Sequence, residues 1–278
     1  MQYHVVHHTE NAFLSEQVDL VYRLQNTQNT PQYYKTVTNG IIGLGIILKG
    51  SAFIDVDGQW ELIPRISIYG MGEKPYHIKL SADYEEISIG FKPYAFNFFV
   101  NTQQRYFTKG RITDASLLYP GHTLEELAEA VSKSKNDPDI LSALDGFFQK
   151  QFNSDRSDHR VRAATQWIYD NDIIRVQDIA QKLDISSVTL RNLFDEHVGV
   201  TPKELIKITR THNVLKQCAF FKENLTELGY EFGYFDQSHF IKEFKSVMGI
   251  TPKAYFRNEQ LAFDFYNYGR WLTDNFTE

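Results

Sequence analysis

Apolar and polar positions alternate along the first 110 residues with the period of two that is typical of β-strands. Gly, Pro and Asp separate the short apolar runs, and Asp57-Gly58 predicts a tight hairpin turn between two of them. The expected strands lie at residues 41–48, 51–56, 60–63, 66–70, 76–80 and 86–91. Many short strands of this kind predict an antiparallel β-roll or small barrel.

From about Thr123 the apolar positions take up helical spacing. Thr123-Leu124-Glu125-Glu126 has the pattern of a capping box and opens one helix. A second amphipathic helix is expected over 139–152, after a break at Asp137-Pro138. Two interpretations remain open: the pair caps the roll as a connector, or it forms a dimer surface. A polar linker follows at 153–158.

Further along, a short string occurs twice. Gly199-Val200-Thr201-Pro202-Lys203 returns 50 positions later as Gly249-Ile250-Thr251-Pro252-Lys253. An apolar residue and a phenylalanine, four apart, precede each copy at the same offset: Leu190 and Phe194, then Phe240 and Phe244. Two matches in register predict a duplicated unit of helix, tight turn and helix. A tandem pair of helix-turn-helix units is an arrangement for reading DNA.

In the first unit we expect a short helix over Val176–Leu183, a turn at Asp184–Ser186 and a helix over Ser187–His197. Ser186 can cap the second helix through its hydroxyl. A helix that reads the major groove presents its N-terminal polar residues to base edges. The candidate DNA contacts are therefore Val188, Thr189, Arg191 and Asn192.

In the second unit, Asn224-Leu225-Thr226-Glu227 starts the first helix and Asp236 caps the second. The polar residues at the start of that second helix are Gln237, Ser238, His239 and Lys242. Between the units, Pro202 to about Phe220 has helical spacing and would form a rigid rod. Two helices in successive major grooves should then lie roughly 34 Å apart.

The string from Gly233 to Tyr255 closely resembles the signature of AraC/XylS-type transcription regulators, and Asp178 to Phe194 looks like their first helix-turn-helix. The resemblance covers about 158–257 and implies a seven-helix domain with both reading helices facing DNA. Asn192 and Lys242 stand where the family often has Arg, and Asp184 replaces a turn glycine. The N-terminal half resembles cupin-like sensing rolls more loosely.

The chain thus reads as an α+β protein, with an antiparallel β-roll, a helical connector and an all-α tandem helix-turn-helix domain. Its 278 residues suit two main domains. The expected boundaries are 1–122 for the regulatory roll, 123–152 for the connector, 157–257 for DNA binding and 258–278 for a helical tail.

Charge is distributed unevenly along the chain. The formal net charge is −6, yet 155–257 hold 15 Lys and Arg against 14 Asp and Glu, a net +1 that leaves −7 for the rest. Because phosphate affinity follows local positive charge, we expect modest non-specific DNA binding.

The location follows from two further features. A single cysteine, Cys218, excludes an internal disulfide framework and fits a reducing compartment. No leader or bilayer-spanning run is recognisable, so we expect a soluble, cytoplasmic protein with no membrane partner.

Candidate chemistry is sparse. His4, His7 and His8 cluster but lack further ligands, while His77 and His122 are isolated, so neither a metal nor a cofactor is predicted. We therefore expect no enzyme but a sequence-specific, DNA-binding transcription regulator, an activator by resemblance. Its expected partners are double-stranded DNA, RNA polymerase, a small-molecule effector and a second copy.

Two rivals stay open. One is a DNA-docked enzyme or repair protein with its chemistry in the roll, which would need a reactive Cys218 or metal ligands. The other is a structural DNA organiser, which would bind all sequences alike.

Overall fold

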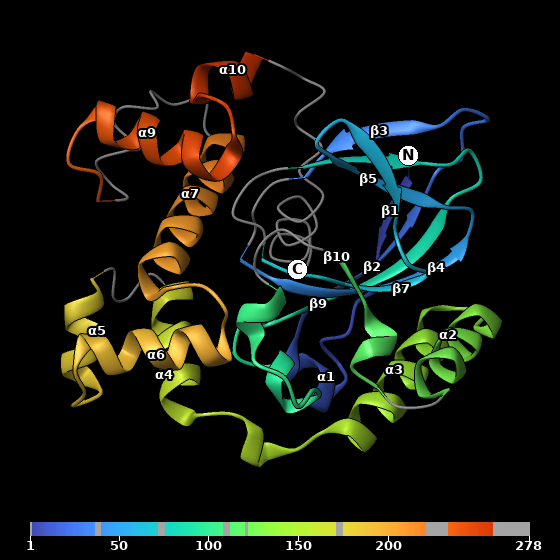
Figure 1. Ribbon diagram of the computed structural model, residues 1–278, viewed down its shortest axis with the longest axis horizontal. Coiled ribbons are helices and arrows are strands. Elements are labelled where there is room, and N and C mark those ends of the chain that lie inside the picture. Colours follow the sequence, from blue (N-terminus) through green and yellow to red (C-terminus); the bar gives the residue numbers. More distant parts are fainter. Residues whose placement is uncertain are drawn as a thin grey trace.

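The strands and the helices that precede residue 152 lie on one side of the protein, and the later helices lie on the other (Figure 1). The computed structural model describes residues 2–36, 40–71, 76–107, 112–119, 122–170, 175–220 and 233–257. The α+β class is confirmed, with an antiparallel N-terminal part and an all-helical C-terminal part. The expected tail at 258–278 and the expected helix from Asn224 lie outside the described residues.

Two antiparallel sheets make up the N-terminal roll. The larger has the strand order β1-β2-β9-β4-β7-β10 and the smaller β3-β8-β5-β6. The bounds are β1 Gln2–Val5, β2 Val18–Gln25, β3 Gln32–Lys35, β4 Ile42–Lys49, β5 Ala52–Val56, β6 Gln59–Leu62, β7 Ile66–Tyr69, β8 His77–Leu80, β9 Glu85–Phe91 and β10 Ile112–Asp114. Six of these match the expected strands, whereas β1, β2, β3 and β10 were not foreseen.

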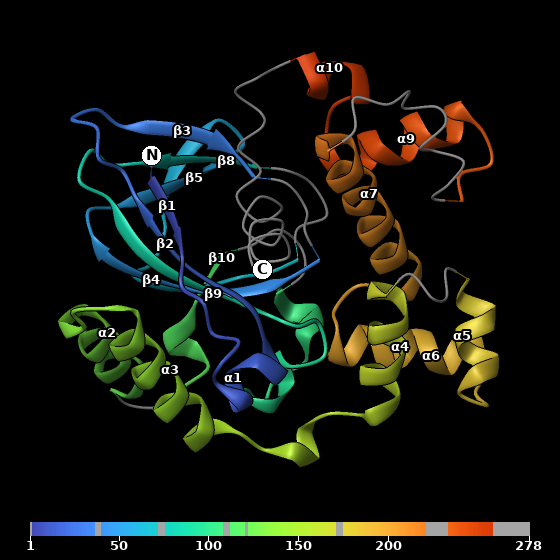
Figure 2. The same ribbon diagram turned by 180° about the vertical axis from the view of Figure 1, so that it is seen from behind.

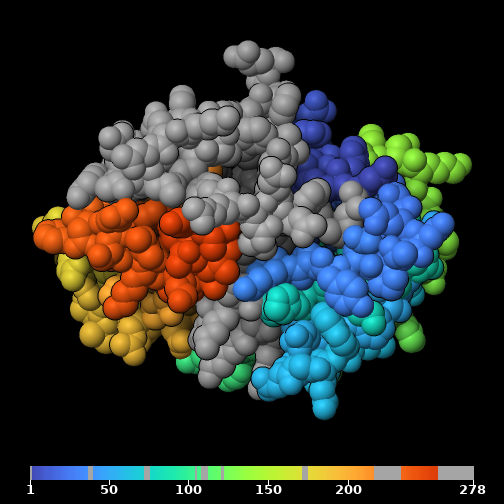
Figure 3. All heavy atoms as spheres, turned by 90° about the horizontal axis from the view of Figure 1, so that it is seen from above, coloured from blue at the N-terminus to red at the C-terminus, as the bar shows by residue number. Residues whose placement is uncertain are grey.

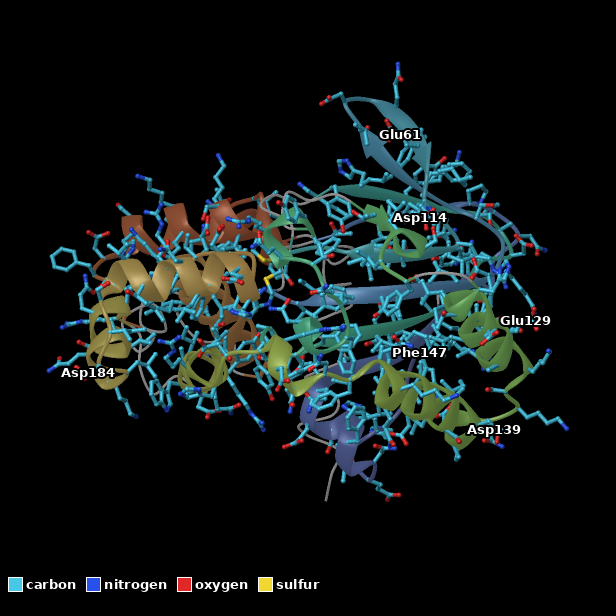
Figure 4. All side chains as sticks on the ribbon, turned by 60° about the horizontal axis from the view of Figure 1, so that its bottom comes forward. Glu61, Asp114, Glu129, Asp139, Phe147 and Asp184 are labelled. Carbon is cyan, nitrogen blue, oxygen red and sulfur yellow. The ribbon has the colours of Figure 1, made fainter. Side chains whose placement is uncertain are left out.

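The hairpin turn between β5 and β6 forms as expected. Asp57 and Gly58 have φ angles of 52° and 85°. These left-handed values are required in a two-residue hairpin turn whose twist matches that of the two strands it joins. The Gly58 amide donates to Asp55 Oδ1 over 2.8 Å, and Val56 pairs with Gln59. The hairpin projects from the body, with Glu61 on its outer arm (Figure 4).

Helices α2 (Thr123–Lys133) and α3 (Asp137–Gln151) cover the outer face of the larger sheet. Phe147 of α3 is buried toward the sheet, while Glu129 and Asp139 point outward (Figure 4). The apolar side chains of both helices share one core with β4 and β9: Leu124, Leu127, Val131, Ile140, Leu144 and Phe148. Their apolar faces are therefore used within the chain, which favours the cap over the dimer surface.

The starts of these two helices differ from expectation. Thr123 is already helical, and the N-cap position falls to His122, whose side chain makes no capping bond. Asp137-Pro138 opens α3 instead of breaking the chain, with Asn136 as its cap. Proline is tolerated in a first helical turn because its missing N–H would lack an intrahelical partner there.

The remaining helices are short, apart from α7. The early ones are α1 Ala12–Gln17 and the 3-10 turns η1 Phe96–Phe98, η2 Gln104–Phe107, η3 Ala115–Leu117 and η4 Ser154–Arg156. The C-terminal ones are α4 His159–Tyr169, α5 Val176–Lys182, α6 Ser187–His197, α7 Pro202–Phe220, α9 Gln237–Met248 and α10 Pro252–Arg257. Figure 2 shows α7 between α6 at one end and α9 at the other.

The buried apolar residues of the described chain form three hydrophobic cores. One fills the roll between its sheets. A second runs without a break from β4 and β9 through α2 and α3 into α4 and α6, and it reaches Leu205 and Ile206 of α7. The third begins at Ile208 of α7 and holds α9 through Phe240 and Phe244. The boundary between the last two cores therefore crosses α7.

A carboxyl group is buried inside the roll. Glu86 accepts hydrogen bonds from the Tyr69 hydroxyl (2.8 Å) and the Tyr84 hydroxyl (2.7 Å). A Cβ at Gly45 would lie 2.2 Å from Glu86 Oε1, so glycine leaves the space that this group occupies. Burial raises the pKa of Glu86, and the two tyrosine hydrogen bonds oppose that shift.

We expect Glu86→Gln to stabilise the protein more at pH 7 than at pH 4.5. The folded-state pKa of Glu86 lies above its ordinary value of 4.5, so ionisation penalises the folded state progressively as pH rises from that value. Urea unfolding of both proteins at each pH measures the difference. An equal difference in unfolding free energy at the two pH values would contradict this account.

Candidate DNA-binding site

Helix α6 exposes the polar residues at its start. Ser186 Oγ accepts the Thr189 amide over 3.0 Å, which confirms the expected cap. Leu190 and Phe194 are fully buried. The four candidates of the first unit are all exposed: Val188, Thr189, Arg191 and Asn192. The structure therefore gathers them on the open side of one helix.

The turn before α6 contains a strained residue. Asp184 has a φ of 53°, which confirms that a non-glycine residue adopts the left-handed geometry there. Asp184 lies at the end of the molecule remote from the strands (Figure 4). The start of α6, three residues on, is thus directed away from the N-terminal roll.

Helix α9 has the same design. Asp236 Oδ1 accepts the His239 amide over 2.7 Å, and Phe240 and Phe244 are buried. Gln237, Ser238 and Lys242 are exposed. In the space-filling view, α9 and α10 form the surface at one end of the molecule (Figure 3).

His239 differs from the other candidates in α9. Its ring is half-buried against Tyr234, and Nδ1 accepts the Phe235 amide over 3.3 Å. Its Nε2 lies 3.3 Å from Glu243 Oε2. Because both ring nitrogens already have partners, His239 is positioned to support the turn, and its contact with DNA stays a prediction.

The structure explains why the Gly-x-Thr-Pro-Lys string occurs twice. Gly199 and Gly249 follow their helices with φ angles of 83° and 72°, where other residues are strained. Thr201 and Glu204 then form a reciprocal capping box for α7, with distances of 2.9 Å from Thr201 N to Glu204 Oε2 and 3.2 Å from Glu204 N to Thr201 Oγ1. The string therefore ends one helix and begins the next.

Helix α7 is continuous over 19 residues, which corresponds to a rod of about 28 Å. Arg210 on this rod pairs with Glu243 of α9, and its Nε donates to Glu243 Oε1 over 3.0 Å. Its guanidinium also lies 4.3 Å from the centre of the Tyr234 ring. This pair, nearly buried on both sides, fixes α9 to α7. Sequence reasoning missed it, because Arg210 is one of several charged residues along α7 and its partner is 33 positions away in the chain.

The N-terminal domain contacts the far end of α6. Asn97 of η1 is buried, and its Nδ2 donates to the His197 carbonyl over 3.2 Å and lies 2.9 Å from His197 Nδ1. Arg105 of η2 pairs with Asp195 at 2.5 Å. The last carbonyls of a helix lack intrahelical partners. The N-terminal domain thus supplies a partner to the end of the first reading helix.

Other contacts join the same two parts. Arg162 of α4 pairs with Glu16 of α1 at 3.1 Å and lies over the Tyr94 ring at 5.3 Å. A Cβ at Gly40 would lie 3.3 Å from both Leu205 and Ile208 of α7. Nothing in the sequence indicated these contacts, because each joins residues far apart in the chain.

In the described residues, two capped helices with exposed polar N-termini, α6 and α9, pack on one continuous helix, α7. Residues 179–258 match a family model described as a helix-turn-helix domain. The C-terminal part of the chain therefore contains a helix-turn-helix domain.

The chain is also similar to YdeC of Bacillus subtilis (strain 168), an uncharacterized HTH-type transcriptional regulator, with 27% identity over 99 residues. The alignment spans 35% of this chain and 34% of that relative, about a third of its length.

The chain is also similar to two solved structures. ToxT from Vibrio cholerae has a TM-score of 0.44 and 17% identity, covering 85% of this chain and 96% of ToxT. The C-terminal domain of AraT, a response regulator from Geobacillus stearothermophilus, has a TM-score of 0.33 and 25% identity, covering 36% of this chain and 85% of that domain. Among the described residues, we find no helix whose length and apolar character suit a membrane span.

We expect Arg210→Leu to lower the unfolding free energy by about 3 kcal/mol, because it leaves the Glu243 carboxylate nearly buried without its main partner. Arg162→Leu is the matched control, since its ion pair with Glu16 is solvent-exposed and should contribute less than about 1 kcal/mol. Thermal and urea unfolding of both variants provide the comparison. Equal losses in the two variants would remove Arg210 as the residue that fixes α9.

We expect Asn97→Ala to speed amide hydrogen exchange in the last turn of α6 about 5–30-fold, corresponding to one lost hydrogen bond of roughly 1–2 kcal/mol. Arg105→Ala should change it much less, because its pair with Asp195 is exposed. Exchange followed by mass spectrometry on the full chain distinguishes the two. Unchanged exchange in Asn97→Ala would show that the α6 terminus is held by other contacts.

Proposed function

We propose that this chain is a sequence-specific DNA-binding transcription regulator controlled through its N-terminal domain. One observation carries the proposal: α6 and α9 both expose their polar N-terminal residues, and both are fixed to the same helix, α7. Recognition helices of this class enter the major groove with that end.

The proposed readers are the exposed side chains of the two helices. Arg191 and Lys242 can reach guanine or phosphate, while Asn192 and Gln237 can pair with adenine. Val188 offers an apolar contact, and Thr189 and Ser238 offer hydroxyl groups. His239 belongs to the proposal as well, although its ring nitrogens already have partners. The expected separation of about 34 Å between the helices stays a prediction.

Regulation would pass through the shared core and the contacts at the end of α6. The first unit packs in the same hydrophobic core as the roll, and Asn97 holds the α6 terminus. A small-molecule effector that shifts η1 or η2 would therefore move α6. Activation of transcription, contact with RNA polymerase and a homodimer complete the proposal. A cytoplasmic location follows from the need to reach DNA.

We also propose that the boundaries 1–122, 123–152, 157–257 and 258–278 mark the functional parts. The packing of α2 and α3 on the larger sheet supports a connector that belongs structurally to the roll.

The enzyme alternative has no supporting observation. Among the described residues, no three His, Cys, Asp or Glu side chains are close enough to hold a metal ion. His8 is buried, and its Nε2 lies 3.1 Å from the Val18 carbonyl, while His4 contacts Asp137. The Cys218 side chain lies outside the described residues. That the chain is no enzyme stays a prediction.

Selection of bound sequences from a random DNA pool tests the proposal directly. We expect the full chain to enrich a sequence with two half-sites about one helical turn apart. Equal binding to all sequences would instead support the structural DNA organiser.

We expect Lys242→Ala to weaken binding to the enriched sequence by about 1–3 kcal/mol if Lys242 reads a base, with loss of preference at one position. If Lys242 contacts only phosphate, the salt dependence of binding should fall by about one counterion. Lys133→Ala, on α2, is the control of equal charge, because it lies far from α9 in the chain and in the fold. Unchanged affinity and salt slope would exclude Lys242 from the site.

A further inference from the structure

The turns that precede α6 and α9 differ in length by one residue. In the first unit, the left-handed residue Asp184 is followed by Ile185 and then by the cap Ser186. In the second unit, left-handed Gly233 is followed by two residues, Tyr234 and Phe235, before the cap Asp236. The second turn therefore holds an extra residue immediately before its reading helix.

Tyr234 takes the inward position that Ile185 has in the first unit. It is 3% exposed, the centres of its ring and the Phe240 ring are 5.1 Å apart, and the Arg210 guanidinium lies over its ring at 4.3 Å. Ile185 is likewise partly buried against the core of the first unit. The extra residue is thus Phe235, and it has no counterpart in the first unit.

Phe235 points into solvent at a fixed place. Its side chain is 86% exposed, more than any other large apolar side chain among the described residues. Its backbone is held, because its amide donates to His239 Nδ1 over 3.3 Å while Tyr234 and Asp236 are anchored on either side. A held, exposed phenylalanine next to Gln237 and Ser238 presents an apolar ring to whatever these residues meet.

One apolar group is available in the major groove, the C5-methyl group of thymine, and aromatic side chains are among its known contacts. We propose that Phe235 contacts a thymine methyl group at the edge of the second half-site and so adds a base preference through a residue that has no counterpart in the first unit. This inference rests on the proposed function, since it needs α9 to enter the groove.

The test uses the full chain and the sequence that it enriches from a random pool. Phe235→Ala should bind that sequence about 5–20-fold more weakly and lose a thymine preference at one position. Replacement of this thymine by uracil, which removes the methyl group, should weaken wild type equally. Because each change removes the same contact, the two together should cost no more than either alone.

Two controls accompany the test. Leu117→Ala removes a side chain that is 76% exposed on η3 of the N-terminal domain, and it should leave the affinity unchanged. Phe235→Leu keeps an apolar group and should retain most of the thymine preference. The salt dependence of binding should stay constant in every variant, because no phosphate contact is lost.

Each outcome decides a different point. If wild type enriches no sequence, both the regulator proposal and this contact fail. If wild type enriches a sequence but Phe235→Ala binds it normally, this contact alone is overturned. The same holds if the losses of affinity caused by uracil and by Phe235→Ala multiply when they are combined. Normal DNA binding by Phe235→Ala with lost transcription would assign the ring to a protein partner and would also overturn it.

Discussion

Helix α7 carries the boundary between two hydrophobic cores, and the arrangement of the C-terminal half depends on it. Its first turns pack through Leu205 and Ile206 into the core that is shared with the roll. Ile208, Val214 and Leu215, further along α7, share a core with Phe240 and Phe244. Because protein cores are densely packed and resist small displacements, α6 and α9 are each fixed to the part of α7 that their own core covers.

This division makes the two units unequal. The first is continuous with the N-terminal domain, which also holds the end of α6 through Asn97. The second is fixed to α7 by its own core and by the pair of Arg210 and Glu243. Under the proposed function, a change in the roll would act on α6 directly. Among the described residues, such a change would reach α9 through a movement of α7.

The C-terminal domain carries little excess charge, so under the proposed function specific contacts would provide most of its selectivity for DNA. The C-terminal domain has a net charge of about +1, and the rest of the chain is acidic. An acidic body repels DNA phosphates and limits non-specific association. The exposed candidates are accordingly mixed: Arg191 and Lys242 carry charge, whereas Asn192 and Gln237 offer hydrogen bonds. Such a surface suits base recognition more than electrostatic attraction.

The sequence by itself determined the local structure. Periodicity and turn residues predicted six strands and the Asp57-Gly58 hairpin. The repeat and its neighbouring residues predicted α6, α7 and α9, with Ser186 and Asp236 as the caps of α6 and α9. These features depend on residues within one or two turns of each other. β2 was missed although Val18, Leu20, Tyr22 and Leu24 alternate with Asp19 and Arg23 as strand positions do. Its partner β1 lies well before it in the chain.

Only the tertiary structure decided the order of the strands, the sharing of one core by the roll and the first unit, and the partners of Asn97 and Arg210. It also turned Tyr234 inward and left Phe235 in solvent, although the two are adjacent aromatic residues. The physical reason is the same in each case. The free energy of such a contact comes from a partner distant in the chain, and the sequence around a residue does not specify which partner that is.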